Sequence, residues 1–239
     1  MPLNVENISV QYKDKKVIEN LSITVDNGEI LGIAGINGAG KSTTLKALTG
    51  LIPVKEGIIS LNDFSPRTSL DKENFKSKLG YCPDVGGVIP SATPREHINL
   101  LMNLSHSSKD EEKVAQAYEM LESVNLKEAV DTPCGSFSHG MLRRMSVVLA
   151  SLNADEMLIL DEPFDGVDPT GINAIKTIIN KHKQDGKIII VSSHLIDVLS
   201  EVADRIIVMV DGEIKVEKEA DFFSGTSGRN RYKKILGVN

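Results

Sequence analysis

One loop near the start of the chain constrains the fold more than any other segment. The stretch Gly35-Ile36-Asn37-Gly38-Ala39-Gly40-Lys41-Ser42 fits the pattern G-x-x-x-x-G-K-[ST] at every fixed position. The apolar run Ile30–Ala34 enters the loop and predicts a strand that is buried on both faces, and a predicted helix over Lys41–Leu51 leaves it. A buried strand, a glycine-rich loop and a helix in this order are typical of an α/β core with a phosphate-binding loop.

The residue types of this loop suit a phosphate chain. Glycines let backbone N–H groups turn inward around phosphate oxygens, and the start of the helix adds positive potential. Lys41 can reach the β- and γ-phosphates, and the Ser42 hydroxyl can ligate Mg²⁺. We therefore expect the loop and the first helical turn to bind a nucleotide, through Gly35, Ile36, Asn37, Gly38, Ala39, Gly40, Lys41, Ser42 and Thr43.

An acidic pair follows a second buried strand. Met157–Leu160 runs straight into Asp161 and Glu162, and open α/β sheets bind ligands at the carboxyl ends of their strands. Asp161 is predicted to hold Mg²⁺, and Glu162 to orient or deprotonate an attacking water. An Asp-Glu pair after a strand is common at solvated strand ends, so this prediction depends on the phosphate loop.

Predicted strands and helices alternate at both ends of the 239-residue chain. Between about 94 and 153 the pattern is helical, and Ser108 with Glu111 fits a capping box before one of these helices. We expect a single domain over 1–239, with a polar, poorly defined tail over 221–239. The predicted fold class is α/β: a P-loop NTPase core with a mixed, mostly parallel sheet and flanking helices, an N-terminal antiparallel β subdomain and an inserted α-helical subdomain.

Composition limits the partners. The net charge is −6, aromatic residues make up 4% and Trp is absent, which argues against nucleic-acid binding. No apolar run approaches the ~18–20 residues of a membrane-spanning helix, and the N-terminus does not resemble a signal peptide. We expect no direct membrane insertion, so that any membrane role comes through a partner protein.

The order of the motifs resembles the ABC ATPase family. The phosphate loop, the helical insert, the stretch Phe137-Ser138-His139-Gly140-Met141-Leu142-Arg143-Arg144, the pair Asp161-Glu162 before Pro163, and finally His194 follow one another as they do in that family. The likeness extends from about residue 3 to 217. In combination the motifs are highly specific, whereas the phosphate loop is the only one that is specific by itself.

The resemblance implies a nucleotide site shared between two subunits. The family's signature stretch, usually LSGGQ, comes from the opposite subunit, and Ser138 and Gly140 match it while His139 replaces the first Gly. Asp168 matches the loop that runs along the dimer seam. Both places also have structural interpretations, because Ser138 can cap a helix and Asp168-Pro169 can start one.

Three further residues receive roles from the resemblance. His194 matches the switch histidine that hydrogen-bonds the γ-phosphate, and Tyr12 matches the aromatic residue that stacks on adenine. Asp84 stands where the family usually has a Gln that contacts Mg²⁺ and the water, so its carboxylate adds negative charge beside ATP. A strand aromatic in the core remains the alternative for Tyr12, and a turn residue after Pro83 the alternative for Asp84.

The resemblance therefore implies an ATPase that powers transport. Two subunits, as a homodimer or heterodimer, sandwich two MgATP molecules on the cytoplasmic face of the membrane and move a separate integral membrane permease. The motifs are similar to those of bacterial exporters, while the transported substance and its direction stay open. Alternatives are a soluble ABC-type ATPase without a transporter, such as an iron–sulfur-assembly or regulatory module, a non-catalytic ATP-binding subunit, and a generic P-loop kinase or GTPase.

Overall fold

The predicted buried strands lie side by side in a six-stranded sheet with the order β5-β6-β7-β3-β8-β9. The computed structural model describes residues 2–13, 15–61, 69–104 and 111–238, without the side chains of 69–72. Neighbouring strands are parallel, except that β9 runs antiparallel to β8 at one edge. The strands of this sheet are β3 (Ile30–Ala34), β5 (Leu79–Cys82), β6 (Met157–Asp161), β7 (Ile188–Ser193), β8 (Arg205–Val210) and β9 (Glu213–Glu219).

Apolar side chains cover both faces of this sheet, because successive residues of a strand point to opposite sides. On β6, Leu158 and Leu160 pack into one core cluster, while Met157 and Ile159 pack into the other. The first cluster includes side chains of the helices within the inserted segment and of the helices that follow it. The second faces α1 (Lys41–Leu48) and a three-stranded antiparallel sheet with the order β2-β1-β4. This smaller sheet consists of β1 (Leu3–Tyr12), β2 (Lys15–Val25) and β4 (Glu56–Leu61).

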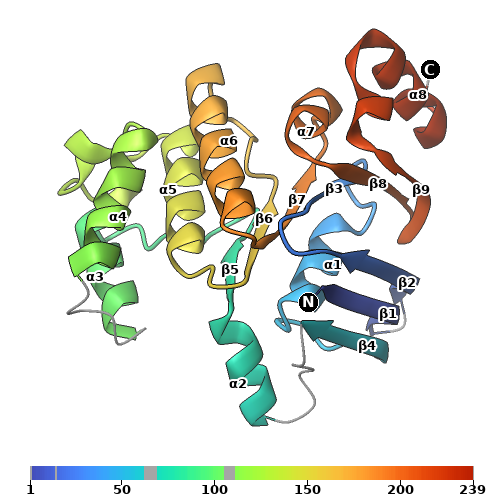
Figure 1. The fold of residues 1–239 in the computed structure, drawn as a ribbon, viewed down its shortest axis with the longest axis horizontal. Helices are drawn as coiled ribbons and strands as arrows, with labels where there is room; N and C mark the ends of the chain where they lie inside the picture. The colour runs from blue at the N-terminus through green and yellow to red at the C-terminus, as the bar shows by residue number, and fades with distance from the viewer. Residues whose placement is uncertain (1, 14, 62–68, 105–110, 239) are drawn as a thin grey trace.

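The helices divide between the core and the inserted segment (Figure 1). Within 94–153 the described residues form helices and turns but no strand, in agreement with the predicted helical content. Ser108 of the predicted capping box lies outside the described residues. The elements of this segment are α3 (Pro94–Leu104), α4 (Glu111–Ser123), η1 (Lys127–Ala129), η2 (Cys134–Ser136) and α5 (His139–Leu152). With α6 (Pro169–Gln184) and α7 (Ile196–Val202) on the core, this arrangement confirms the predicted fold class.

Two helices were missed by the sequence analysis. Helix α2 (Ser69–Ser77) precedes β5 and buries Phe75. Residues 221–238 are not the poorly defined tail that was expected, because η3 (Ala220–Phe223) leads into α8 (Gly225–Leu236), which packs beside α7. Tyr232 of α8 is buried and meets Phe223 edge to face, with ring centroids 6.5 Å apart. A few buried aromatic side chains thus fix a segment whose composition is polar.

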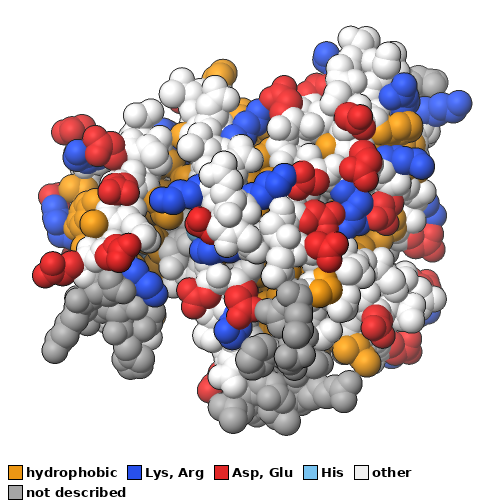
Figure 2. Space-filling view, in the orientation of Figure 1, with side chains coloured by type: hydrophobic (Ala, Val, Ile, Leu, Met, Phe, Trp, Pro, Cys, Tyr) orange, Lys and Arg blue, Asp and Glu red, His pale blue; other side chains and the backbone are white. Residues whose placement is uncertain are grey.

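The surface in Figure 2 mixes basic and acidic side chains, so that neither sign forms a broad field on that face. Among the residues that the structure describes, no helix is long and apolar enough to span a lipid bilayer.

Candidate active site

The predicted functional segments meet at the carboxyl edge of the parallel strands. Strands β6, β7 and β3 are neighbours in the sheet, and they lead into Asp161-Glu162, His194 and the phosphate loop respectively. Asp84 follows β5, the next strand along. A cavity of about 390 Å³ opens here, and it is lined by Val17, Ile36, Asn37, Gly38, Gly40, Lys41, Ser42, Thr43, Asp84 and Glu162.

The loop itself requires glycine at two places. Gly38 and Gly40 have φ angles of 85° and 104°, in the left-handed region that other residues rarely adopt. A Cβ atom on Gly40 would also lie 2.8 Å from Cδ1 of Ile18. The loop leads directly into α1, and the first three residues of α1 line the cavity. The first backbone N–H groups of a helix have no partner within the helix.

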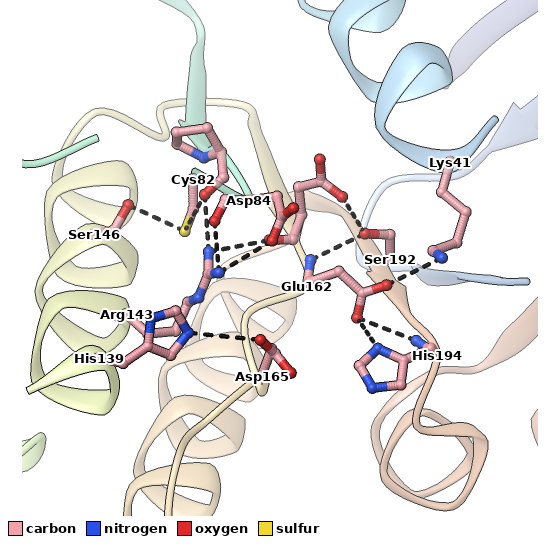
Figure 3. Close-up of polar contacts among 12 residues, drawn as sticks. Lys41, Cys82, Asp84, His139, Arg143, Ser146, Glu162, Asp165, Ser192 and His194 are labelled. Carbon is pink, nitrogen blue, oxygen red and sulfur yellow. Dashed lines mark hydrogen bonds and ion pairs between the residues drawn. The ribbon is translucent and has the colours of Figure 1, made fainter. Parts of the chain in front are cut away.

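Lys41 is the first residue of α1 and is almost fully buried. Its Nζ atom donates a hydrogen bond to the Gly35 carbonyl at 2.8 Å and forms an ion pair with Glu162 Oε1 at 3.1 Å. The side chains of Lys41 and Glu162 are only 6% and 10% exposed. The lysine predicted to bind phosphate and the carboxylate predicted to act as the base therefore touch each other (Figure 3).

Glu162 is held from several sides. Its other oxygen, Oε2, accepts a hydrogen bond from the His194 backbone N–H at 3.1 Å and lies 2.9 Å from His194 Nδ1. Its own backbone N–H donates to Ser192 Oγ at 3.0 Å. The φ angle of Glu162 is +50°, which is uncommon for a residue with a side chain. These contacts keep the carboxylate beside both Lys41 and the half-exposed His194 ring.

Asp161 is completely buried at the end of β6. Its Oδ1 atom accepts a hydrogen bond from Ser192 Oγ at 2.6 Å, and its Oδ2 atom has no hydrogen-bond partner among the described residues. Burial raises the pKa of Asp161, the Ser192 and Ser42 hydroxyls lower it in part, and the negative charge of Asp84 raises it further. A buried carboxylate oxygen without a partner, beside a hydroxyl, fits the oxygen ligands that Mg²⁺ prefers.

Asp84 pairs with a basic residue that the sequence analysis did not single out. Arg143 of α5 donates from Nη2 to the Asp84 carbonyl at 2.6 Å and to Asp84 Oδ1 at 3.1 Å. It also donates from Nη1 to the Pro83 carbonyl at 2.9 Å and to the Asp161 carbonyl at 3.4 Å. One buried guanidinium thus ties the ends of β5 and β6 to the helix that begins at the signature stretch.

The remaining predicted residues lie outside this cavity. Ser138 caps α5, because its Oγ accepts the Met141 N–H at 3.3 Å, and Asp168 caps α6 by accepting the Gly171 N–H at 2.6 Å. Both structural interpretations are therefore confirmed, and Gly140 lies in the first turn of α5. Tyr12 is half exposed at the end of β1, and none of these four residues lines the phosphate-loop cavity.

The sequence analysis gave no role to three residues near the site. Arg143 sits in the middle of a helix pattern, where a basic residue gives no signal of its own. Ser192 gave one signal, a polar residue after an apolar run, in the segment that leads to His194. Tyr232 of α8 is buried near the phosphate loop; burial together with the charge of Glu162 raises its pKa to about 12, and the backbone of Gly35 lowers it in part.

Comparison with known proteins places this geometry in a family. Residues 18–165 match the family model described as ABC transporter. The chain is 32% identical over 232 residues to the linearmycin resistance ATP-binding protein LnrL of Bacillus subtilis, covering 95% of this chain and 72% of that protein. It is 30% identical over 221 residues to the human ATP-binding cassette sub-family A member 10, covering 91% of this chain and only 14% of that much longer protein.

A solved structure agrees over nearly the whole chain. The ATP-binding subunit of an ABC transporter superposes with a TM-score of 0.88 at 28% identity, covering 98% of this chain and 99% of that one. These matches fit the interpretation as a transporter subunit and not the alternative of an ATPase without a transporter. The chain belongs to the ABC transporter family and is similar to its ATP-binding subunits.

Proposed function

We propose that the cavity at the phosphate loop binds MgATP and that Glu162 is the general base for its hydrolysis. The observation that carries this assignment is the position of the Glu162 carboxylate, 3.1 Å from Lys41 Nζ and 2.9 Å from His194 Nδ1. A general base must lie within reach of the water that attacks the γ-phosphate, and Lys41 is proposed to bind the oxygens of that phosphate. The contacts of Glu162 meet that requirement.

Each residue has a separate task in the proposed reaction. The backbone N–H groups of the loop and the Lys41 ammonium bind phosphate oxygens, and Lys41 compensates charge that develops in the transition state. Glu162 takes the proton of the attacking water, and His194 orients the water and the terminal phosphate. Asp161 and Ser42, with Asp84 at the wall, hold Mg²⁺. The metal ion, when bound, neutralises charge on the β- and γ-phosphate oxygens.

A second subunit completes the site in this proposal. Ser138 and Gly140 lie at the N-terminus of α5, a place where backbone N–H groups and the helix dipole favour an anion. Both residues lie outside the cavity of their own chain, so they are free to meet the γ-phosphate bound by a partner subunit. ATP then binds the closed dimer better than the open one, and hydrolysis reverses this difference.

The proposed membrane partner docks beside Asp84 and α3. Four large apolar side chains are exposed in this part of the chain, and Val85 is the most exposed of them at 85%; the others are Ile89, Leu100 and Leu104. A cavity of about 220 Å³ lies among the same segments, with Ile89 and Leu100 in its wall. We infer a permease segment with apolar side chains as the occupant, which places the subunit at the cytoplasmic face of the membrane. The name of the LnrL relative gives linearmycin resistance as the role of that protein, and an exporter-like role is proposed here by analogy.

The proposal is tested by comparing Lys41→Ala with Lys46→Ala. Both lysines lie on α1, but Lys46 is exposed and outside the cavity. We expect the purified chain to hydrolyse ATP with magnesium and to form more dimer with MgATP in light scattering. Lys41→Ala should lose both properties and Lys46→Ala should keep them. A chain that binds no nucleotide, or a Lys41→Ala variant as active as the wild type, contradicts the assignment.

A further inference from the structure

Ser192 stands out among the buried polar residues near the active site. It lies on β7 with no exposed surface, in a strand whose preceding residues are all apolar. In the sheet register it is paired with Asp161 on β6. Its hydroxyl therefore points at the strand end that carries both acidic residues (Figure 3).

The hydroxyl of Ser192 serves both acidic residues at once. It donates its single hydrogen to Asp161 Oδ1 at 2.6 Å, and it accepts the backbone N–H of Glu162 at 3.0 Å. The same N–H also reaches the Ser192 carbonyl at 3.2 Å. A serine uses its donor and its acceptor here in two different directions, which an alanine cannot do.

Each of the two hydrogen bonds fixes a different property of the site. The bond to Oδ1 sets the orientation of the Asp161 carboxylate, so that Oδ2 is the oxygen left for a metal ion. The bond from the Glu162 N–H helps to hold a backbone whose φ angle of +50° would otherwise relax. Because Ser192 is fully buried, water cannot take over either bond when the hydroxyl is removed.

We propose that Ser192 is a positioning residue for the metal–nucleotide site, in which its hydroxyl orients the Asp161 carboxylate toward Mg²⁺ and holds the backbone of Glu162. The inference rests on the proposed roles of Asp161 and Glu162. Groups that hydrogen-bond a metal ligand without touching the metal typically affect metal affinity by about 10- to 100-fold. Removal of the hydroxyl should therefore act mainly on the part of nucleotide affinity that depends on the metal.

The neighbouring residue provides a matched control. Ser193 lies on the same strand and is equally buried, but its hydroxyl accepts the Leu195 backbone N–H at 3.0 Å. Ser193→Ala thus removes a buried hydroxyl and one hydrogen bond without touching either carboxylate. Both substitutions should lower the free energy of unfolding, whereas an effect on the metal should be confined to Ser192.

The experiment measures binding of a fluorescent, non-hydrolysable ATP analogue with and without Mg²⁺. In the wild type we expect Mg²⁺ to tighten binding. In Ser192→Ala and Ser192→Cys the factor by which Mg²⁺ tightens analogue binding should be smaller than in the wild type by about tenfold or more. The affinity without metal should stay within about twofold of the wild-type value. Ser192→Thr, which keeps the hydroxyl, and Ser193→Ala should retain the gain. Mn²⁺ titration followed by electron paramagnetic resonance should rank the variants by metal affinity in the same order. A raised Mg²⁺ concentration should partly restore ATP hydrolysis by Ser192→Ala.

The possible outcomes separate this inference from the proposed function. A wild-type gain that persists in Ser192→Ala overturns the role of Ser192 and leaves the active site as assigned. Absence of any Mg²⁺-linked gain in the wild type overturns the metal site and this inference with it. If Ser192→Ala does not fold, as judged by circular dichroism, Ser192→Cys against Ser192→Thr carries the comparison, because the thiol is a much weaker hydrogen-bond donor.

Discussion

Two regions that the proposal assigns to the nucleotide differ in burial and in the contacts that their side chains make within the chain. At the carboxyl edge of the large sheet, Lys41, Glu162 and Ser192 are buried, and Glu162 contacts both of the others directly. At the start of α5, the side chain of His139 is 61% exposed, and its Nε2 atom lies 3.5 Å from Asp165 Oδ2 of the neighbouring loop. In the proposed mechanism the first region binds the phosphates within one chain. The second is a helix N-terminus outside that cavity, and the proposal assigns it to the nucleotide of another subunit.

Glu162→Gln, at the carboxyl edge of the large sheet, should have the largest effect on ATP hydrolysis. The substitution keeps the shape of the side chain but removes the base, so kcat should fall by about a thousandfold or more while nucleotide binding persists. Steady-state ATPase assays and analogue binding measure the two quantities. Glu122→Gln, an exposed residue paired with Lys127, is the control. Rapid hydrolysis by Glu162→Gln would mean that the base lies elsewhere.

Ser138→Asp, at the start of α5, should lower turnover almost as strongly. Aspartate caps a helix as well as serine does, so the free energy of unfolding should change by less than about 0.5 kcal/mol. The added negative charge, however, faces the partner's γ-phosphate, and turnover should fall by about a hundredfold. Affinity of the monomer for nucleotide should not change. Ser136→Asp, on exposed η2, controls for charge alone, and equal turnover in both variants would leave Ser138 a cap and nothing more.

His182 of α6 lies away from the active site and is a buried titratable residue. Neither ring nitrogen has a hydrogen-bond partner among the described residues, so His182 contrasts with the paired Glu162. Burial lowers its pKa from 6.5 to about 4, helped by the charge of Lys187. Above pH 6.5 both the folded and the unfolded chain hold it neutral. As pH falls toward 4 only the unfolded chain gains the proton, so stability is lost.

Between pH 7 and pH 5 this loss should reach about 2 kcal/mol. His182→Leu should remove that part of the acid sensitivity, since it has no proton to gain. Urea unfolding of both proteins at pH 7 and pH 5 gives the difference. The remaining titrating groups are shared by both proteins, so they cancel. Equal losses in the two proteins would show that His182 is protonated in the fold or finds a partner there.

Asp84→Asn should have the smallest effect. It removes a negative charge from the wall of the phosphate cavity while Arg143 keeps its bonds to three backbone carbonyls. Metal-free binding of the ATP analogue should tighten by about three- to fivefold, because an exposed charge at this range contributes on the order of 1 kcal/mol. Asp26→Asn, on an exposed turn, is the control. Unchanged metal-free affinity would place the Asp84 carboxylate outside the field felt by the phosphates.

The sequence predicted the parts of the site that are local and not those that depend on strand order. The loop from Gly35 to Ser42 is continuous, so its pattern carries the chemistry directly. The Ser192–Asp161 bond exists only because β7 lies between β6 and β3, an order that no residue pattern states. Arg143 reaches Asp84 across two elements for the same reason.

The C-terminal segment failed to be predicted for a different reason. Helix α8 has glycines and basic residues but few apolar ones, so its composition does not predict a packed helix. Tyr232 and Phe223 become core residues only where α7 provides a surface for them. Packing against a distant element decided the structure there, and local propensity could not.

Asp84 is the one described residue that lines both the phosphate-loop cavity and a neighbouring cavity of similar volume, which reaches Cys134 and His139. Occupants of the two cavities would therefore lie beside the same carboxylate. Thermodynamic reciprocity then fixes a rule for any molecule that enters the second space: the factor by which it strengthens or weakens nucleotide affinity is the factor by which nucleotide changes its own.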